Sequence, residues 1–177
     1  MTFIKCNQES NILVIDNYSR HQGLKNDLSN FLETHPDVQG RDTNVKASMT
    51  DWIMNAFTEE VHILKREIIS IVEEYFIPKD ITDLNLYYRE FWGNVYRKGD
   101  HALWHDHFPC RFSFVYFLKC KSNHSPLYIE NKCDRKNKPL IIKPVEGRLV
   151  VFPSFIRHKV PIHIHNETRI TLAGNLN

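Results

Sequence analysis

Apolar residues near the N-terminus recur at helical spacing in two stretches. In the first, Leu24, Leu28 and Leu32 follow one another at intervals of four, which places their side chains on one face of a helix. We expect this helix to run from about Arg20 to Thr34, with Ser19 capping its first turn.

The second stretch of helical spacing is longer and ends at about Phe76, just before Pro78. Its apolar residues step by three or four along one face, so we expect a core-packing helix that is capped by Thr50 or Ser48. These apolar residues are Ile53, Phe57, Val61, Leu64, Ile68 and Val72.

Residues 37–49, between the two helices, are polar and aperiodic. They indicate either a plain surface loop or a loop that folds over a site.

From residue 83 onward, short runs rich in aromatic and β-branched residues alternate with turn-forming residues, which is typical of strands. A similar apolar run at residues 12–15 precedes the first helix. The pattern predicts two helices followed by about seven or eight short strands. We therefore expect a mainly β protein with α-helices (α+β), built as a two-sheet sandwich or jelly roll that two N-terminal helices brace. No repeat is visible, so residues 1–177 are expected to form a single domain.

Composition and charge narrow the function classes. The chain has 177 residues and a net charge of +2, which makes no strong case for binding to nucleic acid or to a membrane surface. No apolar run approaches the length needed to cross a bilayer, and the N-terminus lacks the apolar core of a signal peptide. Its four cysteines include no Cys-x-x-Cys motif, which favours thiols in a reducing compartment. We expect a cytoplasmic location, in the host cytoplasm if the source is viral.

The main candidate for chemistry is the segment Trp104-His105-Asp106-His107. Alternate side chains of a strand point to the same face, so His105 and His107 should point together, with Asp106 on the opposite side. Two imidazoles at this spacing can chelate a first-row transition metal. A lone His-x-His pair is more often an ordinary polar strand face, so the interpretation needs support from elsewhere in the chain.

That support lies downstream. His158 follows the apolar run 148–152 and the Pro153-Ser154 break, a suitable position for a third metal ligand at a sheet edge. Arg169 and Thr171 share one face of the last predicted strand. A guanidinium beside a hydroxyl suits the carboxylate of a small dicarboxylic acid, although an outward-facing strand pair would show the same pattern.

In this order, the motifs resemble those of the Fe(II)- and 2-oxoglutarate-dependent dioxygenases, whose fold is the double-stranded β-helix, or jelly roll. The likeness runs from about Ile12 to the C-terminus. Its start is prolyl-hydroxylase-like, because the run Val14-Ile15-Asp16-Asn17 precedes a helix. The nearest likeness is to a small subgroup of such oxygenases from phages and bacteria, which also carry His-x-His. The segment Gly147 to Ser154, followed by His158, resembles the distal-histidine region of the family.

The resemblance implies roles for residues that match these motifs. It implies that His105, His107 and His158 hold Fe(II). It further implies that Arg169 and Thr171 hold the distal carboxylate of the cosubstrate 2-oxoglutarate.

Further residues are candidates for the cosubstrate or the substrate. Tyr96-x-x-Gly99 resembles the family element whose tyrosine helps to hold the cosubstrate, and Ser113 begins a run similar to the strand after the ligand pair. We expect Tyr96 and Ser113 to contribute to cosubstrate binding. Trp92, Asn94 and Trp104 are candidates for the substrate mouth, although ordinary core or rim positions would suit them equally well.

One departure from the family pattern concerns His107, which stands where most members carry a carboxylate. Three interpretations follow. Three neutral imidazoles can hold the iron and leave the site more positive by one charge. Alternatively, His107 is not a ligand and the site is an open two-histidine site. In the third, Asp106 binds after a local bulge, although the pleat points its side chain away. We favour the first interpretation.

The implied reaction consumes 2-oxoglutarate and dioxygen and hydroxylates a substrate C–H bond. One hypothesis is that the substrate is a prolyl or other protein residue. A second is a small metabolite, toward which the basic segment 119–138 would attract an anion. A third is a jelly-roll protein that binds a metal or another ligand without catalysis. No membrane or nucleic-acid partner is expected, because the chain lacks a basic stripe with stacking aromatic residues.

The other histidines are expected to be ordinary surface groups. His163 and His165 form a second His-x-His pair at a predicted hairpin tip, where we expect solvated side chains. We also expect His62, His101 and His124 to lie on the surface.

Overall fold

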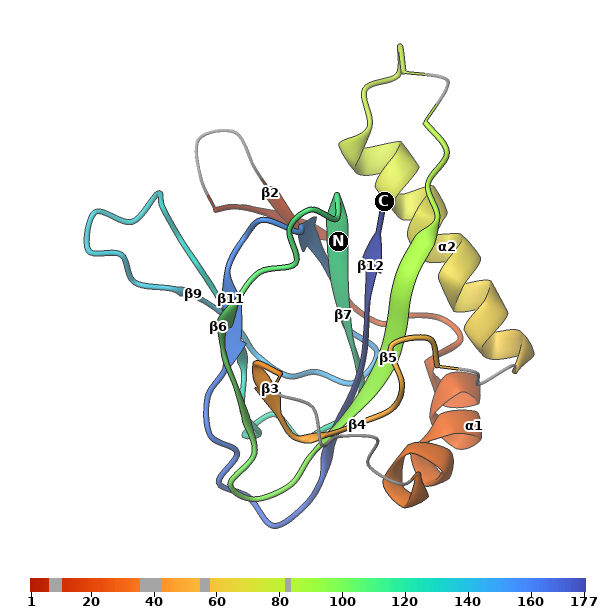
Figure 1. Cartoon of the computed structure of the whole chain (residues 1–177), viewed down its shortest axis with the longest axis vertical. Coiled ribbons are helices and arrows are strands. Elements are labelled where there is room, and N and C mark those ends of the chain that lie inside the picture. Colours follow the sequence, from red (N-terminus) through yellow and green to blue (C-terminus); the bar gives the residue numbers. More distant parts are fainter. Residues whose placement is uncertain (7–10, 36–42, 55–57, 82–83) are drawn as a thin grey trace.

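The computed structural model describes residues 1–6, 11–35, 43–54, 58–81 and 84–177. Two antiparallel β-sheets face each other, and two helices lie beside one of them (Figure 1). The seven strands of the major sheet are, in spatial order, β1 (Thr2–Lys5), β2 (Asn11–Ile15), β10 (Leu149–Pro153), β7 (Phe112–Lys119), β12 (Arg169–Leu176), β5 (Tyr88–Tyr96) and β4 (Ser48–Met49). The five strands of the minor sheet are β3 (Val45–Lys46), β6 (His101–His105), β11 (His158–Val160), β8 (Leu127–Ile129) and β9 (Leu140–Ile142).

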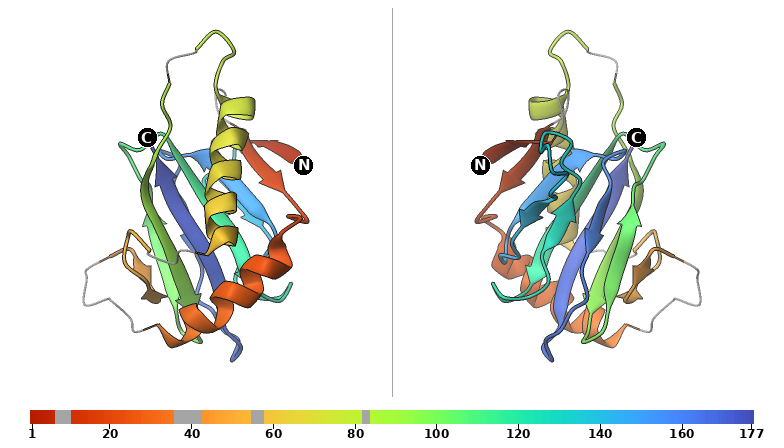
Figure 2. Two further views of the ribbon diagram at one scale, coloured as in Figure 1. Left: turned by 90° about the vertical axis from the view of Figure 1, so that its right-hand side faces the viewer. Right: turned by 90° about the vertical axis from the view of Figure 1, so that its left-hand side faces the viewer.

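Helices α1 (His21–Thr34) and α2 (Glu59–Phe76) cover the outer face of the major sheet (Figure 2). Their apolar stripes are buried in one core together with side chains from that face of the sheet. This core contains Leu24, Leu28 and Leu32 of α1, Val61, Leu64, Ile68 and Val72 of α2, and Phe91, Phe114, Tyr116, Leu118, Val151 and Leu172 of the sheet. The helical spacing seen in the sequence therefore reflects packing against a sheet.

A second core fills the space between the two sheets. It joins Phe117 and Phe152 of the major sheet to Ile129 and Val160 of the minor sheet. Because the central strands of the major sheet are covered on both faces, they are buried almost throughout. Their sequences are accordingly mostly apolar, and the few polar residues among them, such as Ser113, Thr171 and Asn175, are buried. In the described part of the chain, neither helix has the length and apolar character that crossing a bilayer requires.

The caps predicted for both helices are wrong. Arg20, not Ser19, is the N-cap residue of α1, and no side chain caps this helix. The second helix begins at Glu59, and Thr58 caps it by accepting a hydrogen bond from the Val61 N–H at 3.3 Å.

The physical reason for the late start of α2 is that the backbone of residues 50–54 is hydrogen-bonded to β5. The Met54 N–H donates to the Phe91 carbonyl at 2.8 Å, and the Phe91 N–H donates to the Trp52 carbonyl at 2.7 Å. Ile53, which was expected on the buried helix face, is 69% exposed. Phe57 lies outside the described residues.

Strands also appear where none was expected. In the predicted loop 37–49, β3 and β4 form short pairings with β6 and β5, so a plain loop is wrong for this part. The beginning of that segment, residues 37–42, lies outside the described residues, and the expectation that it covers a site is untested. An N-terminal strand, β1, pairs with β2 and extends the major sheet. Strands therefore precede as well as follow the helices.

Candidate functional site

His105 reaches the space between the sheets because β6 contains a bulge. In the β6–β11 pairing, His158 lies opposite His105 but Val160 lies opposite Ala102, so β6 has one extra residue over this interval. Side chains three residues apart in a regular strand point to opposite faces. The bulge instead lets Ala102 and His105 line the same cavity, while Leu103 between them is 48% exposed.

His107 follows the end of β6 and is held by a turn. Its N–H donates to the Ser154 carbonyl at 2.8 Å, and its own carbonyl accepts from the Cys110 N–H at 2.9 Å. The exposed Asp106 accepts a hydrogen bond from the Phe108 N–H at 3.2 Å and is not part of the histidine group. His105 and His107 thus point together as expected. The cause differs from the prediction, because His107 lies in a turn after β6 and not at an alternate position of the same strand.

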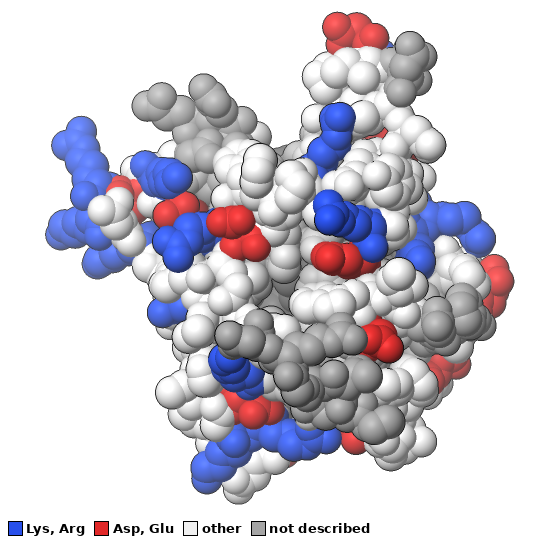
Figure 3. All heavy atoms as spheres, viewed as in Figure 1, with Lys and Arg blue, Asp and Glu red and all other residues white. Residues whose placement is uncertain are grey.

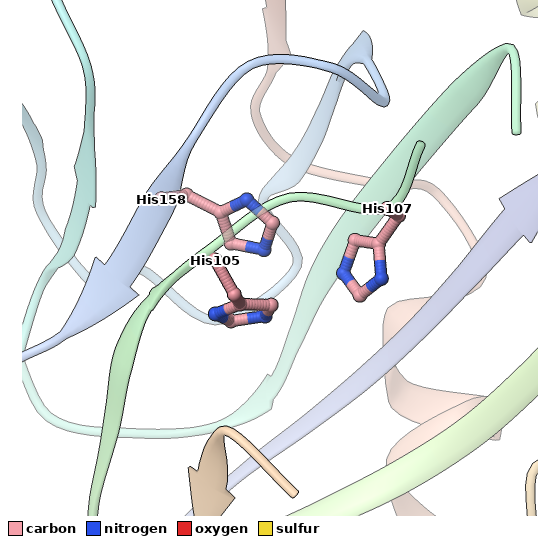
Figure 4. A group of neighbouring side chains, drawn as sticks. All are labelled: His105, His107 and His158. Carbon is pink, nitrogen blue, oxygen red and sulfur yellow. The ribbon is translucent and has the colours of Figure 1, made fainter. Parts of the chain in front are cut away.

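His158 on β11 completes a group of three imidazoles whose candidate ligand atoms all lie within 4.8 Å of one another. The ring centroids are 5.0 Å apart for His105 and His107, 4.3 Å for His105 and His158, and 5.1 Å for His107 and His158. Figure 4 shows the three rings pointing toward a common space. Such a convergence of neutral nitrogen donors is suitable for a first-row transition metal.

Two of the three rings are oriented by their own backbone. His105 Nδ1 lies 2.7 Å from the Leu103 carbonyl, and His158 Nδ1 lies 3.2 Å from the Ile156 carbonyl. A carbonyl can only accept, so Nδ1 carries the proton in both rings and the Nε2 lone pair is available. This carbonyl–imidazole arrangement is common around metal-binding histidines.

Burial keeps the three imidazoles neutral. Desolvation, assisted by the neighbouring His105, lowers the pKa of His107 to about 4. Desolvation also lowers the pKa of His105, and it lowers the pKa of His158 well below its ordinary value. At neutral pH the rings therefore present lone pairs without first having to release protons.

Arg169 on β12 lines the same cavity and is fully buried. None of its guanidinium nitrogens has a hydrogen-bond partner among the described residues. Its Cζ lies 4.8 Å from the Tyr96 ring centroid and 5.0 Å from that of Phe117. Because a buried cation without hydrogen bonds is costly, an anion bound in this cavity would stabilise the guanidinium.

The cavity also gathers most of the other residues that the sequence suggested. Thr171 Oγ1 accepts from Asn94 Nδ2 at 3.4 Å, and Asn94 Oδ1 accepts from Trp92 Nε1 at 3.1 Å. Since the Thr171 oxygen accepts here, its hydroxyl proton is free for a second partner. Tyr96 and Ser113 line the cavity as well.

Trp104 is the one suggested residue that does not line this cavity. It faces the outer side of the minor sheet, where Lys159 Nζ lies 5.1 Å from its ring centroid. The bulge explains this position, because it turns Leu103 and Trp104 outward together. The structure therefore gives no support for Trp104 at a substrate mouth.

The expectation for the second histidine group is wrong. His163 is fully buried and His124 is 3% exposed, so neither is a solvated surface group. Together with the half-buried His165 they form a ring cluster with centroids 4.8 to 5.6 Å apart. Two loops distant in sequence pack together here, which a local pattern could not reveal. His62 is exposed as expected, and His101 is half-buried at the start of β6.

Sequence reasoning missed Ser154 and Asn175 as contributors to the site. Both are fully buried, and both take part in hydrogen bonds to Ser113. A polar Asn within the apolar run of β12 was the available signal, because a buried amide requires a partner.

Comparisons with known proteins agree with this geometry. Residues 90–175 match the family model described as "Putative 2OG-Fe(II) oxygenase". No curated protein matches the chain.

Among solved structures, a prolyl-4-hydroxylase of Pseudomonas putida is similar with a TM-score of 0.73 and 16% identity, over 94% of this chain and 91% of that one. The viral collagen prolyl hydroxylase of Paramecium bursaria Chlorella virus-1, in a 2-oxoglutarate complex, has a TM-score of 0.69 and 12% identity, over 97% of both chains. A prolyl hydroxylase of Trichoplax adhaerens, in complex with a peptide fragment of a hypoxia-inducible factor, has a TM-score of 0.72 and 15% identity, over 93% of this chain and 82% of that one. The predicted resemblance to the Fe(II)- and 2-oxoglutarate-dependent oxygenases, in a prolyl-hydroxylase-like form, is therefore confirmed.

Proposed function

We propose that this chain is an Fe(II)- and 2-oxoglutarate-dependent dioxygenase that hydroxylates an unactivated C–H bond. The observation that carries the proposal is the convergence, in one cavity, of three neutral imidazoles and a fully buried arginine without hydrogen-bond partners. A metal and a carboxylate together would satisfy both groups.

In this proposal His105, His107 and His158 hold the metal. Arg169 and Thr171 bind the distal carboxylate of 2-oxoglutarate, because the guanidinium offers two parallel N–H donors and the hydroxyl a third. The hydroxyl of Tyr96 is a further candidate along the same cavity. Ser113 also lines the cavity, but its hydroxyl donates to Asn175 Oδ1 at 2.8 Å, so it would contribute to the shape of the site without donating to the carboxylate. When bound, Fe(II) and 2-oxoglutarate supply the activation of dioxygen that hydroxylates the substrate.

We favour His107 as a ligand over the two other interpretations. Its ring belongs to the group of three, whereas the exposed Asp106 carboxylate does not. With three imidazoles, the protein contributes no negative charge to the metal, so the loaded site is one unit more positive than with a carboxylate ligand.

For the substrate, we propose a residue of a protein, such as a prolyl residue. The fold is similar to that of prolyl hydroxylases, one of which is in complex with a peptide fragment, and this likeness supports the choice. A small anionic metabolite has less support. The lysines and arginines of segment 119–138 lie mostly on the β8–β9 connection at the side of the molecule (Figure 3), and none of them lines the cavity.

We further propose that residues 1–177 form a single jelly-roll domain in which the two N-terminal helices brace the major sheet. The shared core between α1, α2 and that sheet supports the brace. Exposure of this apolar face in the absence of the helices would be unfavourable.

The first test is anaerobic addition of Fe(II) and 2-oxoglutarate, followed by visible spectroscopy. We expect a metal-to-ligand charge-transfer band in the wild type, which His158→Ala abolishes and Arg169→Ala weakens. His101→Ala, on the same strand as His105 but outside the group of three, is the matched control and should retain the band.

Absence of the band in folded, iron-loaded wild type would disprove the dioxygenase proposal and leave a metal- or ligand-binding jelly roll. If the band forms, 2-oxoglutarate turnover with a panel of peptides against a panel of small acids separates the two substrate classes. Turnover that only the small acids stimulate would overturn the protein-substrate proposal.

A further inference from the structure

A chain of hydrogen-bonded polar side chains joins three neighbouring strands of the major sheet, β7, β12 and β5, to the turn that follows β10. Ser154 Oγ lies 2.7 Å from Ser113 Oγ, Ser113 Oγ donates to Asn175 Oδ1 at 2.8 Å, and Asn175 Nδ2 donates to Glu90 Oε2 at 2.5 Å. Ser113, Ser154 and Asn175 are each at most 2% exposed, while Glu90 is half-buried. The register places Ser113, Asn175 and Glu90 in one row, because Ser113 and Glu90 both lie opposite Asn175. Ser154 directly follows β10, the strand that pairs with β7 on its other side.

The direction of these hydrogen bonds is fixed by the number of protons available. Asn175 can donate to the Glu90 carboxylate only through Nδ2, so its Oδ1 faces Ser113 and accepts. The single hydroxyl proton of Ser113 is used in that bond. The bond between the serines must therefore be donated by Ser154, and every member of the chain has a partner.

The backbone of Ser154 holds both ends of the turn that carries His107. Its carbonyl accepts from the His107 N–H at 2.8 Å, and its N–H donates to the Arg111 carbonyl at 3.0 Å. This attachment is important for His107 because, within the described residues, no hydrogen bond to the His107 ring is seen. The rings of His105 and His158 are each oriented by a backbone carbonyl.

We propose that Ser154, fixed by Ser113 and Asn175, is a positioning residue that sets the orientation of the His107 imidazole toward the metal. The proposal rests on the proposed function, in which His107 is a ligand. Ser154 connects the sheet to the turn through two sets of hydrogen bonds: its hydroxyl bonds to Ser113 in the sheet, and its backbone bonds to the turn. Loss of the hydroxyl bond would let the turn move relative to His105 and His158.

The test is the affinity for Ni(II) and the visible spectrum of Co(II) in Ser154→Ala. Removing a group that orients a metal ligand typically lowers affinity by a factor of about 10 to 100. We expect a loss of about tenfold and a changed Co(II) spectrum. Ser125→Ala is the matched control: Ser125 is 6% exposed and its hydroxyl lies 3.1 Å from His163 Nδ1, away from the chain. It should lower thermal stability to a similar extent and leave metal affinity unchanged.

A double-mutant cycle shows whether Ser154 acts through His107. In a His107→Ala background, Ser154→Ala should cause no further loss of Ni(II) affinity, because the positioned ligand is already absent. An equal loss in both backgrounds would overturn the proposal in favour of a general loosening of the fold. Ser113→Ala, which removes the sheet side of the same connection, should reproduce the loss and covers the case in which Ser154→Ala does not fold.

Two negative outcomes are distinguishable. If the wild type binds no metal, the proposed function fails, and the positioning role fails with it. If the wild type binds metal and Ser154→Ala binds it equally well with an unchanged spectrum, the positioning role alone is wrong.

Discussion

At the scale of single residues, Arg169 is the most informative side chain. It is fully buried, and its cation has aromatic neighbours but no hydrogen-bond partner among the described residues. Burial lowers its pKa, because an apolar surrounding disfavours the charged form of the guanidinium. In the proposed function this guanidinium binds the cosubstrate carboxylate, and its unpaired charge costs stability in the ligand-free protein.

Arg169→Met tests this trade between stability and binding. The variant removes an unpaired buried charge and keeps an apolar side chain of similar length, so ligand-free protein should melt no lower than the wild type. Addition of 2-oxoglutarate to Ni(II)-loaded wild type should raise Tm. At a hundredfold excess of ligand over Kd, the free energy of unfolding should increase by about 2.7 kcal/mol. Differential scanning calorimetry should show no such increase for Arg169→Met. A 2-oxoglutarate shift equal to that of the wild type would contradict the assigned role.

His124, unlike Arg169, is a buried titratable group that lies outside the proposed active site. Desolvation, with His163 and His165 adding to it, lowers its pKa to about 4. The corresponding value in an unfolded chain is about 6.5. Between these values the unfolded state binds a proton that the native state does not, so stability falls as pH decreases from about 6.5 toward 4.

His124→Gln should therefore flatten the decrease in stability on acidification, by up to one proton's contribution to the slope. The measurement is urea unfolding of metal-free protein at pH 8 and at pH 4.5. The pH 8 values serve as the reference, since the imidazole is neutral in both states there. An unchanged difference between the two pH values would show that His124 does not contribute to acid sensitivity.

At the scale of elements, the bulge in β6 decides which side chains enter the cavity. Its extra residue brings Ala102 and His105 to one face and turns Leu103 and Trp104 outward. Bulges that re-aim a side chain next to a functional site are common in sheets.

Deletion of Trp104 should restore regular alternation and turn residue 105 away from the cavity. Isothermal titration with Ni(II) should then show loss of high-affinity binding, while circular dichroism should retain the β signal. Trp104→Ala keeps the strand length and should bind within about threefold of the wild type, because the half-buried Trp104 ring lies outside the cavity that holds the three histidines. High-affinity binding by the deletion variant would rule out the bulge as the orienting device.

The two helices are also tested at the element scale. Leu28 and Ile68 are buried in the core that α1 and α2 share with the major sheet. Leu28→Ala and Ile68→Ala should each lower the free energy of unfolding by about 2–5 kcal/mol. Glu73→Ala, on the exposed side of α2, should change it by less than about 0.5 kcal/mol. Denaturant unfolding measures all three, and small effects for the core variants would argue against the helices as a brace.

At the scale of the whole molecule, the site exists only between the two sheets. His105 and His158 come from the minor sheet, whereas Arg169 and Thr171 come from the major sheet. A ligand that contacts both groups of residues therefore connects the two layers. Ligands that bind only the native state stabilise it, and here the stabilisation should extend to both sheets.

Hydrogen exchange tests this connection. Ni(II) alone should slow amide exchange mainly in β6 and β11, and the further addition of 2-oxoglutarate should slow exchange in β12 as well. Mass spectrometry of peptides from the three strands measures it. Protection confined to β6 and β11 with both ligands present would contradict binding of the cosubstrate to Arg169.

The sequence by itself determined the two amphipathic helices, most of the later strands and the order of the candidate ligands. Periodicity is a local property, so the stripe of Leu24, Leu28 and Leu32 could be recognised without the rest of the chain. The arrangement of His105, His107, His158 and Arg169 along the chain was sufficient to suggest one site.

Only the tertiary structure decided how those residues meet. The bulge that aims His105 depends on pairing with β11, and the turn that aims His107 depends on Ser154. The start of α2 moved to Glu59 because residues 50–54 pair with β5, a contact that no local pattern contains. Burial of His124 likewise follows from two distant loops packing together. In each case the deciding interaction joins segments far apart in sequence. Local patterns of residues do not specify such contacts.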